Sequence, residues 1–164
     1  MVKNALVREA HVIALIERIG DHYRANISNR FIRPALLQLP LDKQAWDLIE
    51  VLTEKLEQYR YQGFHLDELY RQIVASSRFV SVTRRDLVPT LRFRFANSSS
   101  SGPDKVLRDM AVNNFSSNLQ VFADLLNELF LSLVEIDKQK AKGRRPLYMS
   151  IPELQDLGRL LIGN

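Results

Sequence analysis

One apolar stripe constrains the fold of this chain more than any other feature of its sequence. From Val112 to Ile136 the apolar residues follow one another in alternating steps of three and four positions. An α-helix, with about 3.6 residues per turn, places residues at this spacing on one side of its surface. The stripe consists of Val112, Phe115, Leu119, Phe122, Leu126, Leu129, Leu133 and Ile136. A long helix with such a face must be covered by other elements, which is typical of an all-α protein.

The same segment is apolar on more than one side, so it is predicted to be the centre of a helical bundle. In its second half, further apolar residues stand beside the stripe: Leu125, Phe130, Leu131 and Val134. A helix that is apolar over most of its girth is covered on several sides. Pro103 suits the first helical position, with Ser101 or Gly102 as the cap, and the helix should end near Lys138. The expected fold is mainly α, a bundle of four or five helices around this long helix.

Other segments supply the helices that would cover the long one. Apolar residues at helical spacing predict a first helix over 3–33, which Asn26 and its polar neighbours weaken. The same spacing predicts a helix over 42–61, capped by an aspartate and ended by a glycine, and a short helix over 66–74. A capping box at Ser150–Glu153 indicates the start of a last helix. The inward face of that helix would consist of Ile151, Leu154, Leu157 and Leu161.

The period of the pattern changes in residues 79–95. β-branched residues are concentrated in 79–83, and apolar and charged residues alternate strictly over 91–95. Both features are typical of strands, so a small two-stranded β-ribbon that rests on the bundle is predicted. The alternative is a helix that begins at Thr83, but Pro89 would then lie inside it and remove a backbone hydrogen bond. The sequence leaves both interpretations open and favours the ribbon.

Nothing in the sequence indicates a division into separate domains. The length of 164 residues suits one domain, and a serine-rich, flexible loop at 97–102 is expected to join two parts of one core. No apolar run reaches the roughly 18 residues that a membrane-spanning helix needs. The first residues lack the charged region and apolar core of a signal peptide. We therefore expect a single helical domain over 1–164, without a transmembrane segment, in the cytoplasm.

The sequence contains few residues suited to catalysis or metal binding. The absence of cysteine excludes thiolate metal sites and cysteine nucleophiles. His11 and His22 would lie about 16 Å apart along one helix, too far for one metal ion. A row of acids, Asp47, Glu50, Glu54 and Glu57, is typical of the solvated face of an amphipathic helix. With no phosphate-binding or hydrolase motif, we expect no catalytic residue, metal or cofactor, although an enzyme site assembled from distant residues stays an open alternative.

Two basic segments are the best candidates for a functional surface. Residues 70–100 contain six arginines and one acid, and residues 138–145 contain five basic residues and no acid. The candidates for binding a partner or an anion are Arg78, Arg84, Arg85, Arg92, Arg94, Lys138, Lys140, Lys142, Arg144 and Arg145. Arginine donates paired hydrogen bonds to carboxylate or phosphate, which suits acidic protein surfaces and nucleic acids alike. A structural role is the competing explanation, because cations near a helix end oppose its partial negative charge.

These features favour a non-enzymatic helical interaction or scaffold protein that acts through a protein partner or through self-association. Although the formal net charge is only +4, the two basic segments are balanced by an acidic remainder, so the surface is uneven. In a ribbon, Arg92 and Arg94 would share the outer face. The alternative function is nucleic-acid binding through residues 70–100 and the basic run 138–145.

Overall fold

A computed structural model describes residues 2–27, 54, 58, 65–96 and 103–162. Within these ranges all regular structure is helical, and no strand occurs. The prediction of an all-α protein is therefore confirmed. The predicted helix over 42–61, except for two of its positions, and the predicted serine-rich loop at 97–102 lie outside the described residues.

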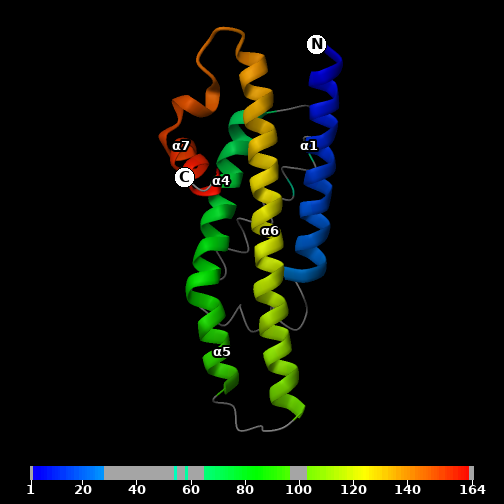
Figure 1. Cartoon of the computed structure of the whole chain (residues 1–164), viewed down its shortest axis with the longest axis vertical. Coiled ribbons are helices and arrows are strands. Elements are labelled where there is room, and N and C mark those ends of the chain that lie inside the picture. Colours follow the sequence, from blue (N-terminus) through cyan, green and yellow to red (C-terminus); the bar gives the residue numbers. More distant parts are fainter. Residues whose placement is uncertain (1, 28–53, 55–57, 59–64, 97–102, 163–164) are drawn as a thin grey trace.

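The described helices follow one another along the chain, with π-helical turns between some of them. Helix α1 (Val2–His22) continues into the π-helical turn η1 (Tyr23–Ile27). Helix α4 (Leu66–Val82), the π-helical turn η2 (Thr83–Leu87) and helix α5 (Val88–Ala96) form one continuous rod (Figure 1). The long helix α6 (Pro103–Ala141) runs back alongside this rod, and the short 3-10 helix η3 (Leu147–Ser150) and helix α7 (Pro152–Ile162) follow it.

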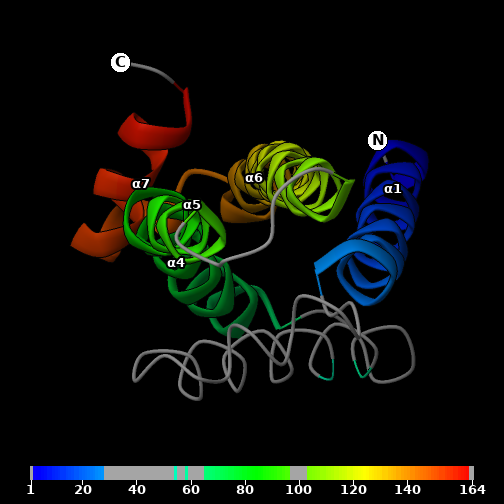
Figure 2. The ribbon, with the colours of Figure 1, turned by 90° about the horizontal axis from the view of Figure 1, so that it is seen from below.

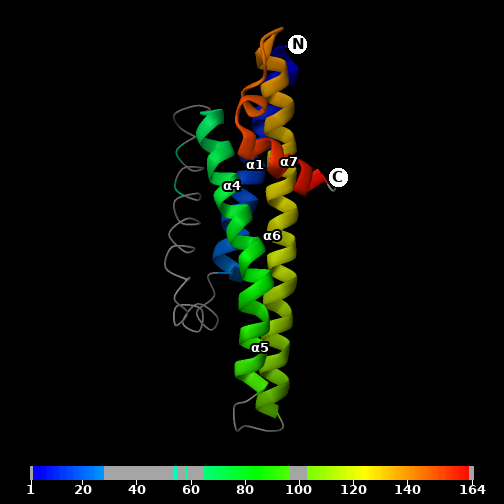
Figure 3. The ribbon, with the colours of Figure 1, turned by 90° about the vertical axis from the view of Figure 1, so that its left-hand side faces the viewer.

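Helix α6 carries the apolar stripe that the sequence predicts. Every residue of the stripe, from Val112 to Ile136, is at most 2% exposed. The helix contacts α1, η1, α4, α5, η3 and α7. Helix α1 lies on one side of α6, whereas α4, α5 and α7 lie on the other (Figure 2). Helix α5 packs beside the first part of α6 (Figure 3). As predicted, α6 begins at Pro103, and it continues beyond Lys138 to Ala141.

The predicted β-ribbon over 79–95 is wrong, because these residues are helical throughout. The N–H of Val88 donates to the carbonyl of Thr83, which closes a π-helical turn directly before the proline. Helix α5 continues the rod from Val88 without a break, and Pro89 is its second residue. Proline cannot donate a hydrogen bond to a carbonyl of the preceding turn, and the wider π-helical turn before it accommodates the missing bond. The π-helical turn thus removes the objection that favoured the ribbon.

Helix α1 and η1 cover the described part of the predicted first helix over 3–33, of which residues 28–33 lie outside the described residues, and a pair of polar contacts lies where α1 passes into η1. The chain changes to a π-helical turn after His22, in the region that the sequence marks as weak. The His22 Nε2–H donates to the carbonyl of Asn118 in α6, at 2.9 Å. The Asn26 amide donates to His22 Nδ1 at 3.1 Å. Both ring nitrogens are satisfied in this way, which is a structural role and not that of a metal ligand.

The predicted capping box at Ser150–Glu153 is also wrong. The Ser150 hydroxyl donates to the carbonyl of Leu147 at 2.7 Å, within η3, and does not cap α7. The N–H of Leu154 donates to the carbonyl of Ile151 at 3.0 Å, which makes Ile151 the residue that precedes α7. The inward face of α7 is nevertheless as predicted, since Leu154 and Leu157 are buried and Leu161 packs against the same core.

The buried carboxylate of Asp137 attaches η3 to α6. Asp137 is only 4% exposed. One of its oxygens accepts the N–H of Leu147 at 3.1 Å, and the other accepts the N–H of Tyr148 at 3.0 Å. The first N–H groups of a helix have no partner within that helix, so Asp137 satisfies them from a different element. This pair of bonds fixes the start of η3 and thereby helps to position α7.

The hydroxyl of Tyr70 leads to a prediction about stability. Tyr70 is fully buried against Phe130, with its ring at 5.9 Å and edge-on, and burial strongly raises the pKa of its hydroxyl. That hydroxyl has no hydrogen-bond partner among the described residues. Burying an unpaired hydroxyl costs free energy, so Tyr70→Phe should leave stability unchanged or raise it by about 1 kcal/mol. Urea denaturation of the two proteins measures the difference, and a loss above about 1 kcal/mol would show that the hydroxyl is bonded.

Candidate partner-binding groove

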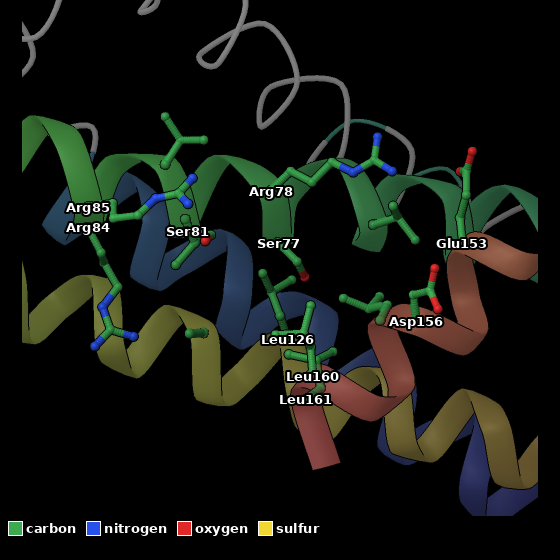
Figure 4. Close-up of a pocket in the computed structure, with 15 residues that line it drawn as sticks. Ser77, Arg78, Ser81, Arg84, Arg85, Leu126, Glu153, Asp156, Leu160 and Leu161 are labelled. Atoms are coloured by element: carbon green, nitrogen blue, oxygen red, sulfur yellow. The ribbon is translucent and has the colours of Figure 1, made fainter. Parts of the chain in front are cut away.

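An open groove of about 800 Å³ lies between the rod formed by α4 and η2 and the surface of α7 (Figure 4). We call it the α4–α7 groove. Its floor and its α7 wall are mainly apolar, with Ala123 and Leu126 from α6 and Leu157, Leu160 and Leu161 from α7. Leu160 is 79% exposed, whereas Leu126 is buried. The groove thus presents apolar surface that the described part of the chain does not cover.

The α4–η2 wall of the groove carries three of the predicted arginines. Arg78, Arg84 and Arg85 all line the groove and are exposed to solvent. None of the three has an ion-pair partner in the described ranges. Positions 74, 77, 78 and 81 of α4 line the same wall, at the spacing of one helix face. Two of the arginines belong to the π-helical turn η2, and π-helical turns inside α-helices are frequent at functional sites.

The opposite end of the groove carries acidic residues. Glu153 and Asp156, on the first turns of α7, lie at the end away from Arg84 and Arg85 (Figure 4). Asp156 forms an ion pair with Arg159 at 3.8 Å, in which both side chains are largely exposed. Such a pair contributes little in water, so it leaves the charge of Asp156 available to an approaching group. The groove is therefore basic along α4 and η2 and acidic at the start of α7.

The other two arginines predicted in residues 70–100 lie on α5, away from the groove. The Arg92 guanidinium donates to the Asn113 side chain of α6 at 3.1 Å, a contact between the two antiparallel helices. The backbone of Arg94 belongs to α5, and its side chain lies outside the described residues. The predicted surface shared by Arg92 and Arg94 depended on the ribbon. In a helix, residues two apart point in different directions, so that surface is not formed as predicted.

Local contacts account for much of the basic run 138–145. Arg144 donates to the carbonyls of Lys140 and Ala141, at 3.4 and 3.3 Å, and so satisfies carbonyls at the end of α6. Arg145 donates to the carbonyl of Met149 at 2.8 Å. Lys140 forms an ion pair with Glu9 of α1 at 3.1 Å. Lys142, with a φ of 45°, lies in the turn that leaves α6, and Lys138 is exposed on its last turn. Arg144 thus caps the end of α6, and Lys140 links α6 to α1.

A second ion pair reinforces the contact between α1 and α6. The Arg8 guanidinium lies 2.9 Å from the Glu135 carboxylate. The hydrogen bond from this guanidinium, together with its positive charge, holds the pKa of Glu135 below its usual range. Both side chains of the pair are partly exposed to solvent, so its contribution to stability is modest.

As binding candidates, the sequence singles out arginines that line one wall of the groove and none of the residues that line the other. Arg78, Arg84 and Arg85 stood out because basic residues are concentrated in 70–100. Glu153, Asp156 and Leu160 gave no such signal, since each is ordinary for an amphipathic helix. Their role depends on the contact between α4 and α7, which lie far apart in sequence. The one available sign was that the inward stripe predicted for α7 leaves out Leu160 and Ile162, which are apolar.

The described residues contain no cluster that suggests a metal site. No group of three or more histidine, aspartate or glutamate side chains is arranged to hold a metal ion within the described ranges. Of the predicted row of acids, Glu54 is described and exposed, and the other three lie outside. Among the described helices, none combines the length and the apolar character that crossing a membrane requires.

Comparison with known proteins adds no functional information. No family model matches the chain, and neither a curated protein nor a solved structure shows detectable similarity to it. The function must therefore be argued from the groove and from the surrounding charges.

Proposed function

We propose that this chain is a non-enzymatic, cytoplasmic interaction or scaffold protein that binds a protein partner in the α4–α7 groove. In this proposal residues 1–164 form a single helical domain, a bundle of four or five helices around α6. The observation that carries the proposal is the combination of an uncovered leucine surface with arginines that have no ion-pair partner in the described ranges.

The apolar floor favours a protein partner over a nucleic acid. Nucleic-acid interfaces are strongly polar and positively charged, and their energy comes largely from phosphate contacts. Protein interfaces instead place apolar side chains at their centre and polar side chains at their rim. The α4–α7 groove corresponds to a protein interface, because its lining combines the apolar Leu157, Leu160 and Leu161 with Arg84 and Arg85. The basic run 138–145 weakens the nucleic-acid alternative further, because Lys140, Arg144 and Arg145 already have local partners.

A titration with nucleic acid distinguishes the two functions. We expect the protein to bind unrelated duplex DNA and single-stranded RNA only weakly at physiological salt, because the described basic groups are few and partly engaged. Two double variants serve as probes: Arg84→Glu with Arg85→Glu in the groove, and Lys138→Glu with Lys142→Glu in the basic run. Fluorescence anisotropy at several salt concentrations gives the affinity and its salt dependence.

One result would favour the alternative function. Sub-micromolar binding of unrelated RNA or DNA that falls steeply with salt, and that either double variant abolishes, would contradict a protein-binding role. Leu160→Asp provides a further control, since it changes the apolar surface and no basic residue. A nucleic-acid-binding protein should be affected only slightly by Leu160→Asp, whereas binding of a protein partner in the groove should be lost.

A further inference from the structure

We infer that the occupant of the α4–α7 groove is an acidic amphipathic helix of a protein partner. Its apolar face would lie on the leucines, and its carboxylates would meet Arg78, Arg84 and Arg85. This inference rests on the proposed function and adds the chemical character of the partner. Three properties of the groove support it, namely its walls, the spacing of its arginines and the distribution of its charge.

Both walls of the groove are helical faces. On α4 the lining positions 74, 77, 78 and 81 recur three or four residues apart, with Val80 and Val82 beside them, and on α7 Glu153, Asp156 and Leu160 have the same spacing. Helices pack by fitting such rows of side chains into the grooves between the rows of a neighbour, with axes about 8–10 Å apart. A third helix with apolar residues at the same spacing therefore fits between these walls, which is the established helix-in-groove mode of peptide recognition.

The spacing of the arginines distinguishes a helix from a ligand with a single anionic head. Arg78 and Arg85 are seven residues apart, which corresponds to about 10 Å along a helix axis. The side chains of Arg78 and Arg85 end at separate places along the groove in Figure 4, so a single phosphate or carboxylate does not match the arrangement of both as they stand. Carboxylates at successive turns of a helix repeat about every 5 Å and can therefore reach each arginine separately. An amphiphile such as a fatty acid would pack on the apolar floor, but its single anionic head would pair with the arginines at one end of the basic wall only.

The charge distribution sets the position of the carboxylates on the occupant. Arg78, Arg84 and Arg85 attract acids along α4 and η2, where no ion-pair partner neutralises them within the described residues. Glu153 and Asp156 repel acids at the start of α7. A partner helix with acids on one flank and neutral or basic residues facing α7 meets both conditions. Such complementarity selects the partner and speeds its encounter.

Three synthetic peptides of about 16 residues test this inference against the full-length chain. The acidic peptide is an amphipathic helix with leucines at helical spacing and glutamates on one flank. The basic peptide has lysine in place of each glutamate, and the scrambled peptide has the acidic composition without the helical spacing. Isothermal titration calorimetry should show micromolar binding of the acidic peptide and at least about tenfold weaker binding of the other two.

Matched variants locate the binding. Arg84→Glu with Arg85→Glu should reverse the preference, so that the basic peptide binds better than the acidic one. Lys138→Glu with Lys142→Glu changes the net charge equally at exposed positions outside the groove and should leave the preference unchanged. Leu160→Asp should weaken every peptide without unfolding the protein, because this side chain is 79% exposed.

The outcomes separate this inference from the proposed function. Equal binding of the acidic and basic peptides, lost in Leu160→Asp, would contradict the inference that the partner helix is acidic. The groove would still be a protein-binding site. A homodimer in sedimentation that Leu160→Asp dissociates would overturn it too, since a second copy would then occupy the groove. Groove-dependent binding of vesicles with anionic phospholipid, in preference to the acidic peptide, would identify a membrane surface instead. Absence of peptide binding together with tight nucleic-acid binding would contradict both proposals.

Discussion

Phe122→Ala should lower the free energy of unfolding by about 3–5 kcal/mol, because it removes a large buried side chain and leaves a cavity. Phe122 is fully buried in the middle of the α6 stripe, and its ring centre lies 6.3 Å from that of Tyr23 in η1. The substitution therefore removes contacts between two elements as well as apolar surface. Urea denaturation followed by circular dichroism measures the loss.

The neighbouring residue provides the control. Val121 lies on the same helix and is 45% exposed, so Val121→Ala should change stability by less than about 0.5 kcal/mol. If Phe122→Ala cost less than about 1 kcal/mol, the ring would not be part of a packed core, and the account of α6 would be incorrect.

Asp137→Ala should cost about 2–4 kcal/mol, the second largest effect that we expect. The carboxylate is buried and accepts two backbone N–H groups, and a hydrogen bond to a charged group contributes about 1.5–3 kcal/mol. Its removal leaves the start of η3 without these acceptors. The loss should therefore appear both in urea denaturation and in faster hydrogen exchange of the Leu147 and Tyr148 amides.

Two further variants separate the carboxylate from its position on α6. Asp137→Asn keeps the size and one acceptor oxygen but turns an amide donor toward an N–H, so an intermediate loss is expected. Gln139→Ala, at an exposed position two residues further along α6, should have almost no effect. Unchanged exchange of both amides in Asp137→Ala would mean that the carboxylate does not hold η3.

The parts of the structure that could be predicted are those with a strong local pattern. The eight stripe residues of α6 are all buried, and the start at Pro103 follows from the preference of proline for a first helical position. The inward leucines of α7 were found in the same way. In each case the period of the apolar residues alone determines which side of a helix is buried.

The incorrect predictions come from competing local signals. Alternation over 91–95 resembles a strand, but the first two apolar positions of that pattern do not lie on the same side, since Leu91 is buried and Phe93 is exposed. Pro89 disfavours the helical alternative only where the helix is regular, and the π-helical turn before the proline removes that objection. At Ser150 the hydroxyl bonds to η3, so the residues that resemble a capping box serve a different turn.

The arginines of the groove stand out in the sequence, whereas the groove itself could not be predicted, for a physical reason. A run of arginines is visible in any sequence, but a groove requires two surfaces whose contact arises only on folding. Arg84 and Arg85 line the same groove as the α7 leucines because α4 and α7 both contact α6 and each other. The position of α7 in turn depends on Asp137, a single acid whose burial nothing in the local sequence indicates.

Nuclear magnetic resonance of leucine methyl groups, with and without the acidic peptide, tests the central claim most directly. If the α4–α7 groove is the partner site, the largest shifts should occur at Leu157, Leu160 and Leu161, and the shifts of Leu157 and Leu161 should disappear in Leu160→Asp. The buried Leu119 provides a reference that should not move. Shifts concentrated instead at Leu131, which is exposed elsewhere on α6, with none in the three α7 leucines, would contradict the account.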